Sequence, residues 1–305
     1  LVGLGAVVWG TKITLDNAVV IARHYQVSDF FIGVAVLAIG SDLPELVVSI
    51  DAALRQLADQ DTSNLIVGNA IGSCFGQLGL VLGIAGMLGP LSPSRRQIVR
   101  HGGVLIVATG LLMLVGFDGV VQRLEGFGLI LAFGAYIVFL LNEEGLVSRS
   151  REPGRAGVAV IWVRLALGLA VVVVSAEVIV RTAVTLAEQW GVDQSFLGIT
   201  IIGVGTSLPE LVISVAAMLR ARIGFSIGNL IGSNILDTLL PIGIAAAIVP
   251  IEFARSLLEF DMLVLLAMTL VALGFLYRSR GVRRPQAIIV LGIYLGYLTS
   301  KTLAL

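Results

Sequence analysis

The amino-acid sequence predicts an all-α integral membrane protein in which ten transmembrane helices form two inverted repeats of five helices each. The first observation is composition: of 305 residues, 57% are hydrophobic and 13% are charged, and the mean hydropathy is +1.00. Soluble domains have about a quarter charged residues, so this composition excludes an ordinary soluble fold. The second observation is a glutamate-bearing phrase that occurs once in each half of the chain, at residues 40–46 and 205–211.

Ten segments are long and apolar enough to cross a bilayer, which requires about 20 mainly apolar residues. Clusters of charged or turn-forming residues separate them, for example at 92–96 and 278–285. The predicted spans are residues 2–24, 29–54, 63–89, 101–117, 124–142, 157–190, 194–219, 224–250, 258–277 and 285–304.

Arginine and lysine indicate the orientation of the spans, because these residues accumulate in cytoplasmic connections. The connections that follow odd-numbered spans carry thirteen of them, and the opposite side carries four. The sequence therefore predicts a multi-pass protein of the cell's inner or plasma membrane with both termini extracytoplasmic. On that outer side, Glu259 and Asp261 are expected in a solvated loop.

The two halves of the chain match each other in sequence. A shift of 165 residues places Glu45 on Glu210, and a shift of 160 places Ser73 on Ser233. The predicted division is a first repeat at 1–142, a short cytoplasmic linker at 143–156 and a second repeat at 157–305. Five spans reverse the chain direction, so the halves are expected to be inverted. Inverted repeats place a substrate site near the membrane midplane and favour alternating access over a permanent pore.

Each repeat carries a pair of motifs that breaks a helix beside an acid. The first pair is Gly-Ser-Asp-Leu-Pro-Glu-Leu at 40–46 with a glycine-rich segment at 68–77, and the second occupies 205–211 and 228–237. Proline removes a backbone donor and clashes with the preceding turn, so the helix opens there. Irregular backbone at this depth is tolerated only when it is buried in protein or lines water. A single copy would fit ordinary helix packing around a satisfied glutamate, but two matching copies favour an ion pathway.

Carboxylates, hydroxyls and freed carbonyls together supply the hard oxygen ligands that Ca²⁺ and Na⁺ accept. With one cysteine and two histidines, the chain offers no soft-metal cluster. Ser73 and Gln77 share one helix face, as do Ser233 and Asp237. The candidate ligands are Glu45, Glu210 and Asp237, surrounded by Asp42, Gln77, Ser41, Ser73, Thr206, Ser207 and Ser233, with backbone carbonyls near Ala38 and Gly203.

These motifs resemble the two repeats of the sodium/calcium exchanger family, the cation/calcium antiporters. The resemblance implies that Glu45 and Glu210 are the central Ca²⁺ ligands, shared in turn with Na⁺. It implies that Asp237 and the position of Gln77 complete a diamond of four ligands. It also implies that the hydroxyl residues and the backbone carbonyls of Ala38 and Gly203 supply further ligands. Finally, it implies that the first and sixth spans are long, tilted helices that slide past the core.

Two residues depart from the family pattern. Asp42 stands where the family usually has a small hydroxyl residue, and Gln77 stands where asparagine or aspartate is usual. If Asp42, Glu45, Glu210 and Asp237 were all ionised, the site would carry a charge of −4. Binding of one Ca²⁺ would reduce the net charge to −2, and binding of three Na⁺ would reduce it to −1. Crowded carboxylates do not all stay ionised in a low dielectric, so a proton or an additional monovalent cation is expected to share the site. The changes could also shift ion choice toward Mg²⁺ or Mn²⁺, or Asp42 could face an aqueous vestibule and bind nothing.

The favoured function is secondary antiport of Na⁺ against a divalent cation, foremost Ca²⁺, with H⁺ or K⁺ as further candidate ions. An H⁺-coupled exchanger of Ca²⁺, Mn²⁺ or Mg²⁺ is the first alternative, and a cation channel is a weaker one. Enzymatic activity is not expected, because no His-Glu-x-x-His and no serine–histidine or cysteine–histidine arrangement is present. The absence of an ATP-binding loop argues against transport driven directly by ATP. The expected partners are inorganic cations and membrane lipid, without nucleic acid, cofactor or an obligate protein partner.

Charged residues within the long spans are expected to pair one helical turn apart. Lys12 with Asp16, and Glu177 with Arg181, occupy equivalent positions in the two repeats with their signs exchanged. Such i, i+4 pairs offset part of the cost of placing charges in a membrane span.

Overall fold

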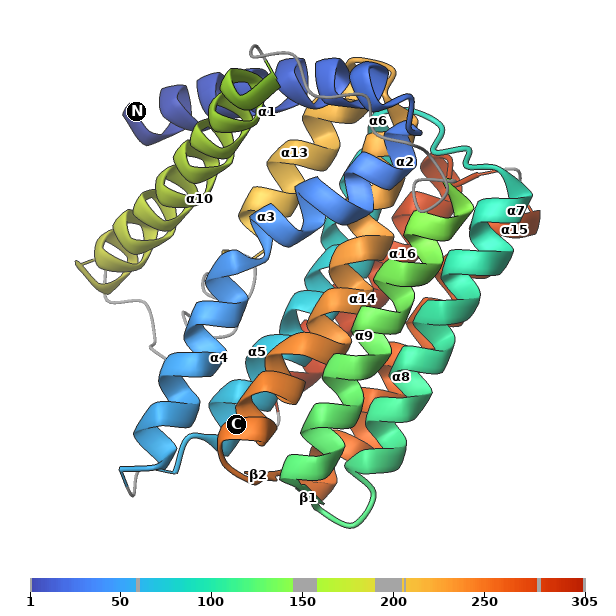
Figure 1. Cartoon of the computed structure of the whole chain (residues 1–305). Coiled ribbons are helices and arrows are strands. Elements are labelled where there is room, and N and C mark those ends of the chain that lie inside the picture. The colour runs from blue at the N-terminus through green and yellow to red at the C-terminus, as the bar shows by residue number, and fades with distance from the viewer. Residues whose placement is uncertain are drawn as a thin grey trace.

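The computed structural model describes residues 2–58, 61–144, 158–189, 205, 207–278 and 281–303. Within these ranges the secondary structure is helical apart from two strands of two residues each and one isolated β-bridge, which confirms the all-α prediction (Figure 1). Seven helices in the described ranges are long and apolar enough to cross a membrane, and a bent helix pair makes an eighth span.

In the first half, the long helix α1 (Val2–Tyr25) is followed by a span that the bend divides into two parts. Its elements are α2 (Asp29–Ile32), the π-helix η1 (Gly33–Ala38), α3 (Ile39–Ser41) and α4 (Leu43–Gln56). The third span combines α5 (Ser63–Gly76), the π-helix η2 (Gln77–Val81) and α6 (Leu82–Leu88). The fourth span combines α7 (Arg95–Gln97), the π-helix η3 (Ile98–Gly102) and α8 (Gly103–Val115). The fifth span is the single helix α9 (Arg123–Glu143).

The second half contains α10 (Val158–Gln189), α13 (Leu208–Leu219), α14 (Ile223–Ile248), a ninth span made of the π-helix η5 (Leu257–Asp261) with α15 (Met262–Arg278), and α16 (Arg284–Leu303). These helices lie where the sixth to tenth spans are predicted. The first part of the predicted seventh span, before Gly205, lies outside the described residues.

The fourth span begins at Arg95, six residues earlier than predicted. A capping box explains the earlier start, because the Ser94 hydroxyl accepts a hydrogen bond from the Gln97 amide nitrogen at 3.2 Å, and the Gln97 side chain accepts one from the Ser94 amide nitrogen at 3.0 Å. The cap supports a helical turn among residues that hydropathy alone assigns to a loop.

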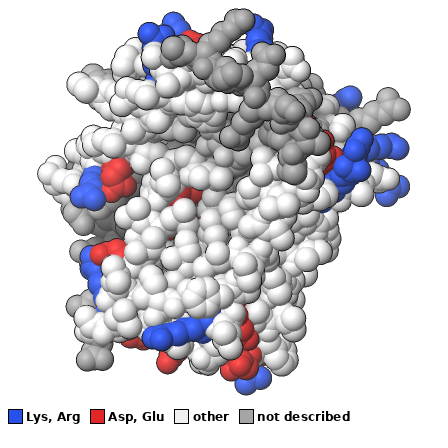
Figure 2. All heavy atoms as spheres, in the orientation of Figure 1, with Lys and Arg blue, Asp and Glu red and all other residues white. Residues whose placement is uncertain are grey.

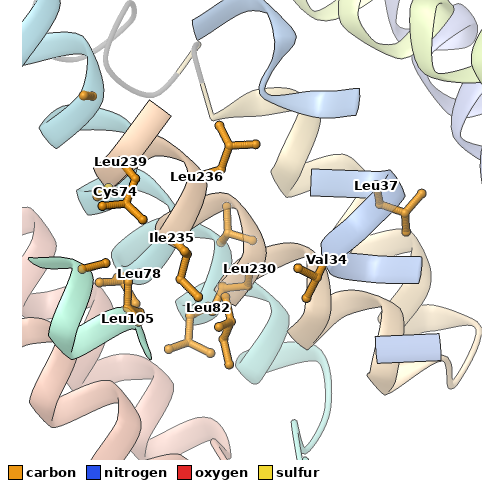
Figure 3. Close-up of a cluster of buried hydrophobic side chains, with 14 of the residues drawn as sticks. Val34, Leu37, Cys74, Leu78, Leu82, Leu105, Leu230, Ile235, Leu236 and Leu239 are labelled. Carbon is orange, nitrogen blue, oxygen red and sulfur yellow. The ribbon is translucent and has the colours of Figure 1, made fainter. Parts of the chain in front are cut away.

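Helix α14 forms the centre of the molecule and contacts elements of both halves (Figure 1). Glycines allow its close approach to the second span: a Cβ added at Gly228 would lie 2.4 Å from the carbonyl oxygen of Phe30. A buried hydrophobic cluster surrounds α14, with Leu230, Ile235 and Leu236 facing side chains from η1, η2 and α6 (Figure 3). This packing fixes the position of the polar residues of α14 relative to the second and third spans.

Helices α1 and α10 pack along each other and form a pair at the edge of the bundle (Figure 1). Their crossing is lined by glycine, since a Cβ added at Gly168 would lie 2.7 Å from the Thr14 Oγ1 atom. The lengths of 24 and 32 residues agree with the prediction that the first and sixth spans are long. Of the predicted i, i+4 pairs, Arg181 and Glu177 form one at 2.6 Å, whereas Asp16 pairs with Arg220 at 2.7 Å instead of with Lys12.

The connections sort to two ends of the bundle. Those after α1, α6, α13 and α15 lie at one end, whereas the α4–α5 connection lies at the other, together with strands β1 (Val120–Val121) and β2 (Ile251–Glu252) (Figure 1). The two strands pair antiparallel. Figure 2 shows a mostly uncharged surface between the charged ends, as expected for a lipid-facing belt.

The prediction of a solvated loop around Asp261 is wrong. Asp261 ends the π-helix η5, which already belongs to the ninth span, and its carboxylate is fully buried. It accepts hydrogen bonds from the Tyr297 hydroxyl at 2.6 Å and from the Lys301 ammonium at 2.7 Å, so its burial is compensated by partners on α16.

Candidate cation-binding site

The two glutamate-bearing phrases break their helices in the same way. Asp42 precedes α4 with φ −85° and ψ 4°, and Ser207 precedes α13 with φ −87° and ψ 9°. Each helix has proline in its first turn, where the missing N–H costs no intrahelical hydrogen bond. At the first break the two helical parts meet at an angle of 44°. Glu45 and Glu210 therefore occupy equivalent first turns, at helix N-termini that favour negative charge.

Three carboxylates from the two breaks converge. One ligand oxygen from each of Asp42, Glu45 and Glu210 lies within 4.8 Å of the other two. All three side chains are buried, and both oxygens of each glutamate, with Oδ2 of Asp42, lack a hydrogen-bond partner in the described ranges. Sequence reasoning predicted that the two glutamates would meet, with Asp237 as the third acid and Asp42 around them; the structure instead places Asp42 in the group of three.

Helix α14 faces this carboxylate group with two polar residues one turn apart. The Ser233 hydroxyl donates a hydrogen bond to Asp42 Oδ1 at 2.9 Å. Asp237 lies outside the 4.8 Å group, and its Oδ2 accepts a hydrogen bond from Gln77 Nε2 at 2.7 Å. Gln77 is the first residue of η2, and its own Oε1 has no described partner. The four members of the implied diamond thus divide into a glutamate pair and an amide–carboxylate pair.

The other candidate ligands differ in whether their oxygen atoms already have hydrogen-bond partners. The hydroxyls of Ser73 and Ser207 are buried without a described partner. Ser41 donates to the Ala38 carbonyl at 3.3 Å, and that carbonyl also accepts from the Asp42 amide at 3.0 Å. The prediction that the helix break frees the Ala38 carbonyl is therefore wrong. The chain remains helical through Ser41, so this carbonyl keeps its hydrogen-bond donors. Thr206 and Gly203 lie outside the described residues.

Two pairs of equivalent polar residues flank the site and were missed at the sequence level. Ser49 and Ser214 lie one helical turn after Glu45 and Glu210, so their spacing could have identified them. On one side, Asn229 Nδ2 donates to the Ser214 hydroxyl at 3.1 Å, and both residues are fully buried. On the other side, Asn69 is only half-buried and donates to the Glu45 carbonyl at 3.4 Å, which leaves the Ser49 hydroxyl unpartnered among described residues.

The electrostatic character of the site follows from these contacts. Among the residues that the structure places, none of Asp42, Glu45, Glu210 and Asp237 forms an ion pair with a lysine or arginine. Removing a carboxylate from water without a compensating charge costs several kcal/mol per ion. An arrangement of converging, unpartnered oxygens with no basic residue is suited to bind a cation.

Comparison with known proteins identifies the family. The model of the family described as "Sodium/calcium exchanger protein" matches residues 1–142 and 160–303. The sodium/calcium exchanger MaX1 of Methanosarcina acetivorans is 28% identical, over 98% of this chain and 96% of that protein. An uncharacterized membrane protein of Methanocaldococcus jannaschii, MJ0091, is 32% identical over 98% of this chain and 96% of its own length.

A solved structure gives the same result at the level of fold. The structure of the sodium-calcium exchanger NCX_Mj soaked with 2.5 mM Na⁺ and 0.1 mM Ca²⁺ superposes with a TM-score of 0.84 at 30% identity, covering 98% of this chain and 95% of that one. Its fold agrees with the ten predicted spans. The chain belongs to the sodium/calcium exchanger family and is a membrane antiporter of Na⁺ and Ca²⁺.

Proposed function

We propose that Glu45 and Glu210, together with Asp42, form the shared site at which this antiporter binds Na⁺ and Ca²⁺ in turn. The observation that carries the proposal is the convergence of three buried carboxylates within 4.8 Å, contributed by two equivalent helix breaks. Like charges this close repel each other, and a bound cation relieves the repulsion. Five oxygens of these carboxylates have no described hydrogen-bond partner and are available as ligands.

The oxygen supply suits a hard cation. Ca²⁺ takes six to eight oxygen ligands at about 2.3–2.6 Å. Five carboxylate oxygens of Asp42, Glu45 and Glu210 and the hydroxyls of Ser73 and Ser207 have no described hydrogen-bond partner. On this proposal Asp237, held by Gln77, supplies charge from the second coordination layer or joins the site when the amide moves.

Exchange, rather than leak, follows from the charge of the site. An ion-free site would carry buried negative charge without a counter-charge, so the conformational change would be disfavoured until Na⁺ or Ca²⁺ binds. Each direction of movement then requires a bound ion, which couples the two fluxes. H⁺-coupled exchange is not favoured by the family assignment, but a proton or K⁺ bound beside Asp42 remains part of the proposal to be tested.

Access from the two sides would alternate through the equivalent serine–asparagine pairs. The buried Asn229–Ser214 hydrogen bond is suited to close the α13–α14 side, and the half-buried Asn69 with the unpartnered Ser49 is suited to an open α4–α5 side. With the arginine distribution, we assign the α4–α5 connection and both termini to the extracytoplasmic side. The proposed repeats are residues 1–142 and 157–305, joined by the linker 143–156.

Ion flux in proteoliposomes tests this function. The full-length protein is reconstituted into vesicles loaded with Na⁺, and Ca²⁺ uptake is followed after dilution into Na⁺-free buffer while K⁺ and pH are varied. We expect uptake that requires the Na⁺ gradient and is lost in Glu45→Gln and Glu210→Gln. Glu259→Gln is the matched control, because Glu259 is exposed and paired with Arg255. Ca²⁺ uptake that persists without a counter-ion would indicate a channel and overturn the proposal.

A further inference from the structure

An apolar cavity of about 490 Å³ lies between α1, α6 and α13 and is not part of the ion site. Its walls include Val8 of α1, Ile84 of α6, and Val215 and Leu219 of α13. Val8 and Leu219 are 67% and 70% exposed, so the cavity opens to the surroundings of the bundle. In a membrane protein the apolar surroundings are lipid tails, which fill such a space more favourably than water.

Two basic residues, Lys12 and Arg220, also line the cavity. Arg220 binds Asp16 at 2.7 Å, so the carboxylate that the sequence offers to Lys12 is already engaged. Lys12 itself is exposed and forms no ion pair with any residue in the described ranges. The cavity rim therefore has a net positive charge with one unpaired ammonium group.

The position of the rim along the membrane normal follows from Arg220. This residue caps the C-terminus of α13, and two residues later Arg222 binds Asp29 at the start of the second span. The α13–α14 connection lies at the end of the bundle where the arginine-rich connections gather (Figure 1). Lys12 lies one helical turn from Asp16, the partner of Arg220, so the rim is near the lipid headgroups.

We propose that this cavity binds an anionic phospholipid, with an acyl chain between α1, α6 and α13 and the phosphate against Lys12 and Arg220. A basic rim above an apolar cavity matches the two parts of such a lipid, and anionic lipids are attracted to lysine and arginine at a membrane surface. A zwitterionic lipid matches the apolar part equally well but carries its own positive charge toward Lys12. The rim therefore selects the anionic headgroup.

The lipid would lie at the interface between the α1–α10 pair and the rest of the bundle. Helix α1 packs chiefly on α10, and it meets α13 beside this cavity. A chain held there separates α1 from α6 and supports the pair at a fixed distance from the core. The binding claim itself is independent of the ion site, so its test does not depend on ion exchange.

Native mass spectrometry of the full-length protein in detergent measures the binding directly. Phosphatidylglycerol and phosphatidylcholine are titrated separately, and we expect one phosphatidylglycerol to bind more tightly than phosphatidylcholine. Lys12→Gln should weaken phosphatidylglycerol binding about fivefold and remove the preference, as expected for one basic residue near a lipid surface. Ala216→Phe, which fills the cavity, should weaken both lipids. Arg255→Gln, an exposed change elsewhere, should alter neither.

Two results would overturn the proposal: equal binding of the two lipids by the wild-type protein, or an unchanged lipid preference in Lys12→Gln. Competition by inorganic phosphate or soluble glycerophosphoglycerol as effective as that by the lipid would show that the rim binds a free anion and not a phospholipid. Lys12→Arg keeps the charge and should retain the preference, which separates charge recognition from a folding defect of the glutamine variant.

Discussion

The side-chain amide of Gln77 and the carboxylate of Asp237 form a hydrogen bond of 2.7 Å that joins the third and eighth spans inside the molecule. Both residues are fully buried, and each keeps one oxygen without a described partner. Asp237 is thus bound to an amide and lies outside the group of three carboxylates whose ligand oxygens come within 4.8 Å of one another. The four acids therefore divide into a group of three carboxylates and a single, amide-bound one.

Replacing Gln77 tests this separation. Gln77→Ala leaves Asp237 without its donor, and a hydrogen bond to a charged group contributes about 1.5–3 kcal/mol. We expect the ion-free variant to unfold more easily by about this amount, with a smaller difference when Ca²⁺ or Na⁺ is present to compensate the freed carboxylate. Chemical denaturation with and without the ions measures it. Gln97→Ala, in an exposed helix cap, is the control; equal effects with and without ions would show that Gln77 has only a packing role.

Asp42→Ser tests the departure that distinguishes the first repeat from the second, because Ser207 occupies the equivalent position. A unit charge pair 4 Å apart contributes ~1 kcal/mol even at the dielectric of water, and a divalent ion doubles this value. We therefore expect Ca²⁺ to bind at least about tenfold more weakly. The K⁺ and pH dependence of exchange should also change, which flux assays at varied K⁺ and pH record. If affinity, ion preference and pH dependence all match the wild type, Asp42 has no part in the mechanism.

Asn229→Ala tests whether the hydrogen bond to Ser214 closes one side of the transporter. A neutral hydrogen bond contributes about 1 kcal/mol, so its loss should raise the population open on that side about fivefold. The reporter is a cysteine at Ala217, which is fully buried next to Ser214, in a Cys74→Ala background. Its modification by a membrane-impermeant reagent from the cytoplasmic side should accelerate accordingly. Asn69→Ala should not accelerate it, and equal acceleration by both variants would contradict a side-specific role.

Gly168→Val tests the packing of α1 on α10. A Cβ at this position would lie 2.7 Å from Thr14 Oγ1 and 2.8 Å from the Thr14 amide nitrogen, so the two helices must separate. We expect slower exchange, by about fivefold or more for an overpacking cost of about 1–3 kcal/mol, with Ca²⁺ binding preserved. Calorimetric binding and vesicle flux distinguish the two effects. Gly5→Val, in the partner helix α1, meets nothing within 4 Å and should leave both unchanged; loss of binding in Gly168→Val would place the crossing within the site.

The sequence was sufficient for much of this architecture. Hydropathy identified the spans, and the repeated Leu-Pro-Glu phrase identified both helix breaks, because proline and glycine act on the local backbone. The convergence of Glu45 and Glu210 followed from symmetry alone. The inverted arrangement of the repeats and the ligand roles of individual residues remain predictions.

Contacts between distant segments could not be predicted. Asp16 has Lys12 one turn away, yet it pairs with Arg220, which is 204 residues distant in the chain. From the sequence alone, Asp261 is indistinguishable from a charged loop residue. Its burial depends on Tyr297 and Lys301 of α16, which donate hydrogen bonds to its carboxylate in the folded protein. The π-helices η1 and η2, which determine where Ala38 and Gln77 lie, leave no simple periodic signal in the sequence.

Calcium binding to the purified protein tests the central role of the two glutamates most directly. Isothermal titration of Ca²⁺ into the wild type, Glu45→Gln and Glu210→Gln, at several fixed Na⁺ concentrations, should show wild-type binding that Na⁺ weakens competitively. Each variant should bind Ca²⁺ at least about tenfold more weakly, because each loses a unit charge next to a divalent ion. Wild-type affinity in both variants, or Ca²⁺ binding indifferent to Na⁺, would contradict a single shared site.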